Sequence, residues 1–271
     1  MTSGRVRRPA RLHARHAAMY GDRSVVRSYR NRPPYPDETI QVLVDLVPAG
    51  CRRVLDVGCG TGPIARPLAA LVEAVDALDP SAAMLDAGRE LPGGDRPTLR
   101  WLLGSAEDAV LHPPYGLVVA AASFHWLQWD VVLPRFAGAL VPDGLLAVVQ
   151  TRERGGPDLR ELIPRYSTNQ DFSVDDDYDW RAELVRLGFL TPVGSRETAW
   201  VPFRQSFDDF VDGQHSMGGM SRERMDPRAV DEFDRELRAI LSRTYPAGEV
   251  EMEVCAVVGW ARPGTGRPPE A

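Results

Sequence analysis

A strand followed by a glycine-rich turn constrains the fold of this chain more than any other segment. Residues 53–57 (RVLDV) are apolar enough to form a buried strand, and glycines follow at positions 58, 60 and 62. Glycine lets the backbone approach a ligand closely, and a helix after such a turn offers free amide hydrogens. A dinucleotide-binding turn has the spacing G-x-G-x-x-G, whereas this turn is G-x-G-x-G followed by Pro63. The spacing therefore fits a ligand that has no pyrophosphate and whose charged amino-acid end lies over the turn.

Strands and helices continue to alternate after the turn. Further strands are predicted at 72–78, 98–103, 115–122 and 145–150, and then at 196–203 and 249–260. Helical segments lie between them, including an amphipathic helix that begins at Asp226-Pro227. This pattern predicts an α/β fold built on a doubly wound, Rossmann-like sheet of seven strands.

The chain divides into three expected parts. They are an N-terminal arm or cap at 1–33, a main domain at 34–262 with lid elements at about 151–190 and 205–225, and a flexible tail at 263–271. Residues 1–32 hold nine arginines and one acid, a charge of +8. Because the net charge of the whole chain is −6, the net charge of the remaining residues is −14. The arm is therefore basic and the main domain acidic.

Composition excludes several classes of protein. A net charge of −6 and a pI near 5.5 argue against a general nucleic-acid binder, which needs a basic face. Three scattered cysteines do not suit a disulfide framework or a metal site, so we expect a reducing compartment and no metal. Residues 109–129 are uncharged, but Pro113-Pro114 interrupts them, so no membrane span is expected. The basic N-terminus lacks the apolar segment of a secretory signal, which favours a cytoplasmic location.

The turn at 55–62 (LDVGCGTG) resembles that of the class I S-adenosylmethionine-dependent methyltransferases. The resemblance covers most of residues 33–150 and is strongest to enzymes of small molecules, including those that methylate trans-aconitate. It implies S-adenosylmethionine as cofactor, with Gly58, Gly60 and Gly62 at its methionine end. It also implies that Asp56 orders the turn or contacts the cofactor's amino group through water.

Two later segments also match this family. Asp79 ends the second strand, where a carboxylate can accept hydrogen bonds from both ribose hydroxyls, although a helix-capping role is the alternative. The resemblance adds Pro80 and Met84 to the cofactor site. Residues 104–108 (GSAED) resemble the segment that binds the adenine edge, through Ser105, Ala106 and Glu107. Ser105 stands where aspartate is common, so Glu107 or Asp108 could accept the bond from the adenine amino group; a solvated loop is the alternative.

Residues 120–129 (AAASFHWLQW) follow at the end of the fourth strand, where open α/β sheets bind ligands. Ala121 is expected beside the cofactor, and Phe124, Trp126 and Trp129 beside the acceptor. The resemblance places His125 near the sulfonium methyl, where a histidine can take a proton from a hydroxyl nucleophile. The alternative is that His125 only shapes the pocket.

The arm and the second lid element complete the predicted site. Residues 29–36 (YRNRPPYP) resemble a segment in which an arginine and a tyrosine close over the cofactor. Tyr29 and Arg32 are therefore expected on the cofactor, Arg32 gripping the methionine carboxylate, and Tyr20 on the acceptor; a solvated Arg32 is the alternative. Phe207, His215 and Met220 suit the wall of an acceptor pocket and equally an ordinary lid core.

The resemblance implies transfer of a methyl group from S-adenosylmethionine to a small-molecule acceptor, with an oxygen acceptor favoured. Alternatives are an N- or C-methyltransferase and a protein that uses the cofactor without methylating, for example in a pericyclic reaction. A nicotinamide oxidoreductase is disfavoured by the glycine spacing. All 32 basic residues are arginine, and none is lysine. This bias suggests a GC-rich bacterial genome and hence a role in secondary metabolism. A homodimer is left open, and neither nucleic acid nor membrane is expected as a partner.

Overall fold

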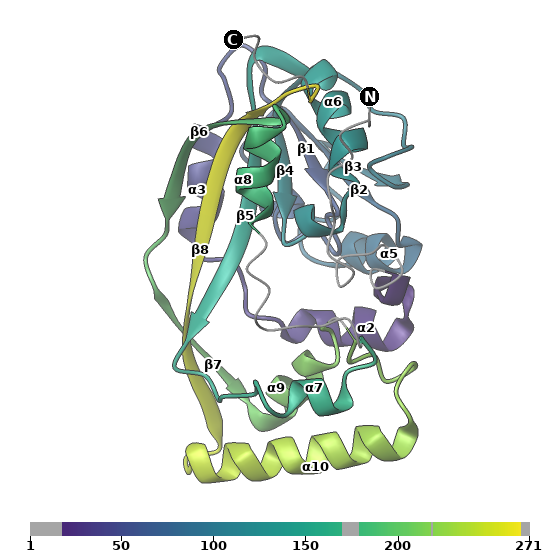
Figure 1. Ribbon diagram of the computed structural model, residues 1–271, viewed down its shortest axis with the longest axis vertical. Coiled ribbons are helices and arrows are strands. Elements are labelled where there is room, and N and C mark those ends of the chain that lie inside the picture. Colours follow the sequence, from purple (N-terminus) through teal and green to yellow (C-terminus); the bar gives the residue numbers. More distant parts are fainter. Residues whose placement is uncertain (1–17, 170–178, 218, 267–271) are drawn as a thin grey trace.

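The computed structural model describes residues 18–169, 179–217 and 219–266, and its centre is a mixed sheet (Figure 1). The strand order is β3-β2-β1-β4-β5-β8-β6, and β7 also pairs with β8. The strands are β1 (Arg53–Val57), β2 (Ala74–Asp79), β3 (Leu99–Leu103), β4 (Tyr115–Ala121), β5 (Leu140–Arg154), β6 (Leu190–Glu197), β7 (Val201–Ser206) and β8 (Glu249–Pro263). The doubly wound α/β sheet expected from the sequence is confirmed.

The sheet has seven positions but eight strands, which corrects the expected number. β1 to β5 are parallel, and β8 runs antiparallel to β5. One strand was predicted at 196–203, whereas β6 and β7 pair in turn with successive parts of β8. Thr198 lies in the break between them and exchanges hydrogen bonds with Ala256 through its backbone amide and its hydroxyl. The edge position of the sheet is therefore shared by two short strands.

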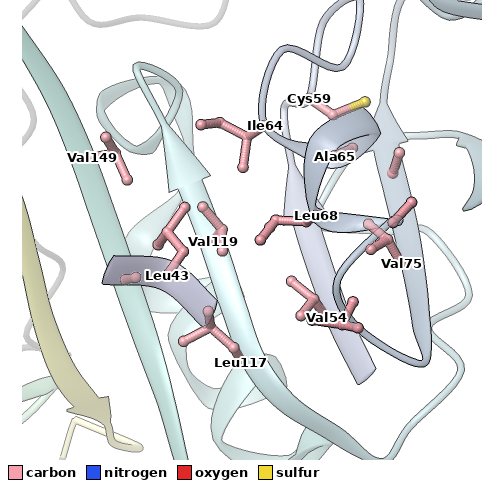
Figure 2. Packing of buried hydrophobic residues seen from close by; sticks show 14 of the residues in the cluster. Leu43, Val54, Cys59, Ile64, Ala65, Leu68, Val75, Leu117, Val119 and Val149 are labelled. Atoms are coloured by element: carbon pink, nitrogen blue, oxygen red, sulfur yellow. The ribbon is translucent and has the colours of Figure 1, made fainter. Parts of the chain in front are cut away.

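Helices cover both faces of the sheet. Helix α3 (Asp37–Asp45) and α4 (Ala65–Leu68) pack on one face, where Leu43, Ile64 and Leu68 join the apolar side chains of the strands (Figure 2). Helix α6 (Trp129–Ala139) and α8 (Trp180–Arg186) contribute to the core on the other face. Helix α5 (Ala82–Glu90) follows β2, and η4 (Phe124–Trp126) follows β4. Both cores leave the carboxyl ends of the parallel strands uncovered.

A second layer lies beyond those carboxyl ends (Figure 1). It contains α7 (Ile163–Tyr166), α9 (Phe207–Gln214) and α10 (Pro227–Thr244), which share a core with side chains of β7 and β8. Asp226 caps α10 by accepting a hydrogen bond from the amide of Arg228, and Phe233, Leu237 and Leu241 bury the apolar face that the sequence predicts. We call this layer the lid.

Residues 18–32 form helical turns that pack against both the lid and α5. They comprise η2 (Ala18–Gly21), α2 (Arg23–Ser28) and η3 (Tyr29–Asn31). Met19 and Val25 are buried with Met84 of α5, while Asp22 accepts hydrogen bonds from Ser221 and Arg224 of the lid. We call residues 18–32 the arm.

Some predicted parts lie outside the described residues. These are residues 1–17 of the N-terminal part, 170–178 of the first lid element, Gly218 of the second lid element and 267–271 of the tail. Within the part that is described, no helix is both long and apolar enough to cross a membrane.

Candidate active site

A cavity of about 370 Å³ opens at the carboxyl ends of β1, β2 and β4. This is the position at which open α/β sheets bind ligands. Its walls come from the three strand ends, the loops that follow them, and the arm. The lining residues are Ala18, Tyr20, Tyr29, Arg32, Val57, Gly58, Gly60, Leu78, Asp79, Pro80, Met84, Gly104, Ser105, Ala106, Glu107, Asp108, Ala121, Ala122, Ser123, Trp126, Leu127 and Gln128.

The glycine turn forms the floor of the cavity. Gly58 has φ of +66°, and a Cβ atom there would lie 2.5 Å from the Cβ of Ser123, so the position requires glycine. Gly60 lines the cavity beneath Tyr29, and its amide donates a 2.8 Å hydrogen bond to Asp79 Oδ2. Gly62 was expected on the cofactor, but it lies behind the turn against Trp101, outside the cavity lining.

Two carboxylates lie at the turn in different settings. Asp79 lines the cavity and accepts hydrogen bonds from the amides of Gly60 and Ser81. Burial raises the pKa of Asp79, and these two amides oppose the rise. Asp56 is buried behind the lining, where burial and the charge of Asp79 raise its pKa to about 7. Asp56 is therefore placed to order the turn, which is one of the two roles expected for it. Asp79 instead faces the cavity.

The loop after β3 forms one end of the cavity. Ser105 Oγ donates to Asp108 Oδ2 at 3.1 Å, and the amide of Asp108 donates to Ser105 Oγ. Glu107 Oε1 accepts a 2.8 Å hydrogen bond from the amide of Gln128. The three acidic or hydroxyl side chains expected in this loop thus line the cavity with Ala106 and, from α5, Met84.

The arm covers the turn. The Arg32 guanidinium carbon lies 4.6 Å from the centre of the Tyr29 ring, and Arg32 Nε donates a 2.9 Å hydrogen bond to Ser216 of the lid. Ser81 Oγ donates to the backbone oxygen of Tyr20 at 2.9 Å, which fixes the arm beside Asp79. Among the described residues no carboxylate lies within ion-pair distance of Arg32. The guanidinium is therefore available to an anionic group above the turn.

The segment after β4 divides between cavity and core. Trp126 lines the cavity and contacts Tyr20 edge to face, with ring centres 6.2 Å apart. Phe124 and Trp129 were expected beside the acceptor, but both are buried and pack with Trp180 of α8. Trp129 Nε1 also donates to the backbone oxygen of Phe124. That expectation was wrong because the two rings join α6 to α8.

His125 lies next to the cavity without lining it. Its ring centre is 4.7 Å from that of Trp126, and its side chain is half-buried. The neighbours Ser123 and Trp126 do line the cavity. In this geometry His125 does not reach the cavity, so it would not contact a bound molecule directly.

Phe207, His215 and Met220 belong to the lid core, which corrects their expected place on the acceptor. Met220 and His215 are fully buried. His215 Nδ1 lies 2.8 Å from the backbone oxygen of Met220, and Nε2 lies 2.7 Å from Asp234 Oδ1. Phe207 packs against the same core. These side chains stabilise the lid, the alternative that the sequence left open.

Several cavity residues were not predicted. Ala122 has φ of +50°, rare for a residue with a Cβ atom, and Ser123 Oγ donates to the backbone oxygen of Val57. A strand ending at Ala121 would have located both of them. Val57, Gly104, Leu127 and Gln128 also line the cavity, and they lie in segments that the sequence placed at the site without singling them out. Ala18 and Leu78 line it too, and their place follows only from the tertiary fold.

The comparisons with known proteins agree with this geometry. Residues 54–144 match a family model described as a methyltransferase domain. An uncharacterized methyltransferase of Mycobacterium tuberculosis is 38% identical over 142 residues, which cover 51% of this chain and 56% of that protein. Residues 54–144 therefore make up a methyltransferase domain. The match spans little more than half the length of this relative, so what the whole protein does is a matter for proposal.

Two further proteins resemble the methyltransferase domain. A malonyl-[acyl-carrier protein] O-methyltransferase of Halalkalibacterium halodurans is 34% identical over 102 residues, covering 35% of this chain and 37% of that protein. The solved structure of a candidate type II methyltransferase from Anaeromyxobacter dehalogenans matches with a TM-score of 0.63 at 20% identity, covering 88% of this chain and 99% of that one. The structural likeness shows that the fold is shared.

S-Adenosylmethionine is the cofactor of the methyltransferase domain, and the residues present fit it. The cavity combines amides of a glycine turn, a buried carboxylate at Asp79 and an arginine that no carboxylate neutralises among the described residues. The amides of the turn match the amino-acid end of the cofactor, Asp79 matches its ribose, and Arg32 matches its carboxylate. No cluster of His, Cys, Asp and Glu in the described part of the chain is arranged to hold a metal ion.

Proposed function

We propose that this protein transfers a methyl group from S-adenosylmethionine to an oxygen atom of a small molecule. The main support is that Gly60, Asp79 and Arg32 line the same cavity at the carboxyl ends of the parallel strands. When bound, the cofactor supplies a methyl carbon that a positively charged sulfur activates. The chain therefore has mainly to align the acceptor with that carbon, and alignment can contribute about 7–11 kcal/mol in favourable cases.

The proposal assigns each wall of the cavity a task. Asp79 accepts hydrogen bonds from the ribose, and Arg32 holds the carboxylate of the amino-acid end through paired hydrogen bonds. Gly58, Gly60 and Ala121 contact the methionine end, while Pro80, Met84, Ser105, Ala106 and Glu107 surround the adenine. Tyr20 and Trp126 form the wall that faces the acceptor. Tyr29 closes the turn from above and keeps water away from it.

An acceptor hydroxyl has to lose a proton, and His125 remains our proposed general base. Because its neighbours line the cavity and it does not, His125 would act through one bridging water. A nucleophile that is already ionised, such as a carboxylate, would need no base.

The oxygen acceptor is supported by the relative whose name specifies O-methyl transfer, although that match covers 35% of this chain. N- and C-methyl transfer and a non-methylating use of the cofactor are the alternatives. The three cysteines are unpaired, which supports our proposal of a cytoplasmic location. A role in secondary metabolism, a homodimer and the lack of a nucleic-acid partner are also proposals.

Calorimetry tests the cofactor assignment. S-Adenosylhomocysteine should bind in the micromolar range and NAD should not bind comparably. Asp79→Ala should weaken binding by roughly 1–3 kcal/mol because the ribose loses a charged acceptor. Asp86→Ala, an exposed position on α5, is the matched control and should bind normally. Tight binding of NAD alone would refute the proposal. Formation of S-adenosylhomocysteine with a panel of acceptors then separates methyl transfer from mere binding.

A further inference from the structure

The guanidinium of Arg32 has two edges that can form paired hydrogen bonds, and the lid occupies one of them. Arg32 Nε donates to Ser216 Oγ at 2.9 Å, and Nη2 donates to the backbone oxygen of Ser216 at 2.5 Å. These two nitrogens form one edge of the planar group. The edge formed by Nη1 and Nη2 is the other one that can hold a carboxylate through paired hydrogen bonds. A single lid residue therefore determines how Arg32 is turned where it lines the cavity.

The Ser216 hydroxyl is oriented so that its oxygen accepts from Arg32. Ser216 Oγ donates a 2.6 Å hydrogen bond to the backbone oxygen of Gly213, and the Ser216 amide donates to the same oxygen at 3.0 Å. Because the hydroxyl hydrogen is used in this bond, Oγ presents a lone pair to Nε of Arg32. Ser216 is fully buried, so solvent does not reach this contact from the side of the lid.

The backbone next to Arg32 rests on the same part of the lid. A Cβ atom at Gly213 would lie 2.9 Å from the backbone oxygen of Asn31, so this close approach of η3 to α9 leaves no room for a side chain. Asn31 Nδ2 donates to Asp212 Oδ2 at 3.0 Å, and Gln205 Nε2 donates to the backbone oxygen of Asn31 at 3.3 Å. The lid therefore places both the backbone beside Arg32 and the Arg32 side chain.

We propose that Ser216 is a positioning residue that fixes Arg32 for the carboxylate of S-adenosylmethionine, so that the lid takes part in selecting the cofactor. This inference rests on the proposed function, which assigns that carboxylate to Arg32. Ser216 lies outside the cavity lining and acts only through Arg32. Tyr20 of the cavity wall also accepts a hydrogen bond from Arg32. Without the Ser216 hydroxyl, Nε loses its acceptor, and one hydrogen bond instead of two holds the guanidinium from the lid.

The test compares two ligands that differ only in the carboxylate. They are S-adenosylhomocysteine and its decarboxylated analogue, which keeps the adenine, the ribose, the sulfur and the amino group. Calorimetry on the wild-type protein should show at least about tenfold tighter binding of S-adenosylhomocysteine, because the analogue cannot make the charged hydrogen bonds to Arg32. Ser216→Ala should lower this ratio of affinities by about fivefold or more and leave the affinity for the analogue within about twofold of the wild type.

Two more variants assign the effect to this hydroxyl. Ser206→Ala is the matched control, because it removes a serine hydroxyl that caps the opposite end of α9 by accepting from the amide of Asp209. It should keep the wild-type ratio. Ser216→Cys nearly keeps the size of the side chain and replaces Oγ by a weak acceptor, so it should also lower the ratio. It provides the test where Ser216→Ala does not fold.

The pair of ligands distinguishes a positioning role from a merely structural one. An unchanged ratio in the Ser216 variants, or an equal loss of affinity for both ligands, would overturn the inference. Arg32→Ala should abolish the preference for S-adenosylhomocysteine. If it does so and Ser216→Ala does not lower the ratio, only the inference fails. If the wild-type protein shows no preference, or Arg32→Ala keeps it, the role of Arg32 in the proposed function is refuted and the inference falls with it.

Discussion

Asp56 is a buried acid whose ionisation affects stability. Its pKa is raised to about 7, whereas an aspartate in an unfolded chain has a pKa of about 3.9. The folded state therefore holds the proton more tightly than the unfolded state. The resulting stability is fully present below about pH 4 and is lost as the pH rises to about 7. One pKa unit corresponds to about 1.4 kcal/mol, so the loss amounts to a few kcal/mol.

Asp56→Asn removes this ionisation while keeping the shape of the side chain. The free energy of unfolding of the variant without cofactor should decrease less between pH 4 and pH 7 than that of the wild type. Urea denaturation at a series of pH values measures the difference. Asp86→Asn, which changes an exposed acid, should keep the wild-type pH dependence. A wild-type pH dependence in Asp56→Asn would contradict the role of this carboxylate.

Ala122 stores backbone strain beside the cavity. Its φ of +50° brings Cβ close to the carbonyl oxygen, at a cost of about 1–2 kcal/mol that glycine avoids. Ala122→Gly should therefore raise the free energy of unfolding by up to about 1 kcal/mol after the greater chain entropy of glycine is subtracted. Ala121→Gly, in extended strand next to it, should lower that free energy by about 0.5–1 kcal/mol. Denaturant melts that show both variants less stable would argue against strain at Ala122.

The sequence predicts side-chain positions well where a motif links a residue to a strand end. Gly60 and Asp79 follow β1 and end β2, and both line the cavity. It fails where burial decides, because an aromatic residue suits a pocket and a core equally well. Trp126 lies in the cavity and Trp129 lies in the core, although three positions separate them. Only the packing of α8 distinguishes the two.

At the scale of elements, the arm is held by the lid and in turn covers the cofactor cavity. Asp22 accepts two hydrogen bonds from Arg224, at 2.6 and 2.9 Å, and Asn31 donates to Asp212 of α9. Neither Asp22 nor Arg224 lines the cavity, whereas Tyr29 and Arg32 do. Cofactor affinity should therefore depend on contacts that do not touch the cofactor.

Arg224→Ala should weaken the binding of S-adenosylhomocysteine several-fold, because the arm then has to be ordered by the ligand. Calorimetry gives the affinity, and Arg235→Ala on the exposed face of α10 is the control. Asp22→Ala also loses the hydrogen bond from Ser221, so it should weaken binding at least as much, and adding Arg224→Ala to it should have little further effect. Unchanged affinity in both single variants would mean that the arm keeps its position without the lid.

The order of helices and strands could be predicted from the sequence for the main sheet, but less well for the lid. β1, β2 and β4 are each followed by a helix, so local periodicity was enough to place these strands. The division of 190–206 into β6 and β7 depends on Thr198 pairing with Ala256, which is 58 residues away in the sequence. Helix α7 of the lid covers only the four residues Ile163–Tyr166.

At the scale of the whole molecule, cofactor, arm and lid should behave as one unit. Amide hydrogen exchange in residues 18–32 and in α9 should slow when S-adenosylhomocysteine binds, because the ligand contacts the arm and the arm contacts α9. Exchange in α3, which packs on a face of the sheet and does not line the cavity, should change little and serves as an internal control. Equal exchange with and without ligand would show that the arm is already fully ordered.

β8 limits which fragments of this protein can be expected to fold. The strand has 15 residues, of which nine, 253–261, pair with residues 146–154 of β5. It also pairs with β6 at one end and with β7 at the other. A fragment that ended where the family match ends, at residue 144, would lack this strand and most of β5. The edge of β4 would then be open, and open edges of apolar strands promote aggregation. We therefore expect that residues 54–144, which identify the domain, do not fold by themselves, and that β8 has to be kept in any fragment made for study.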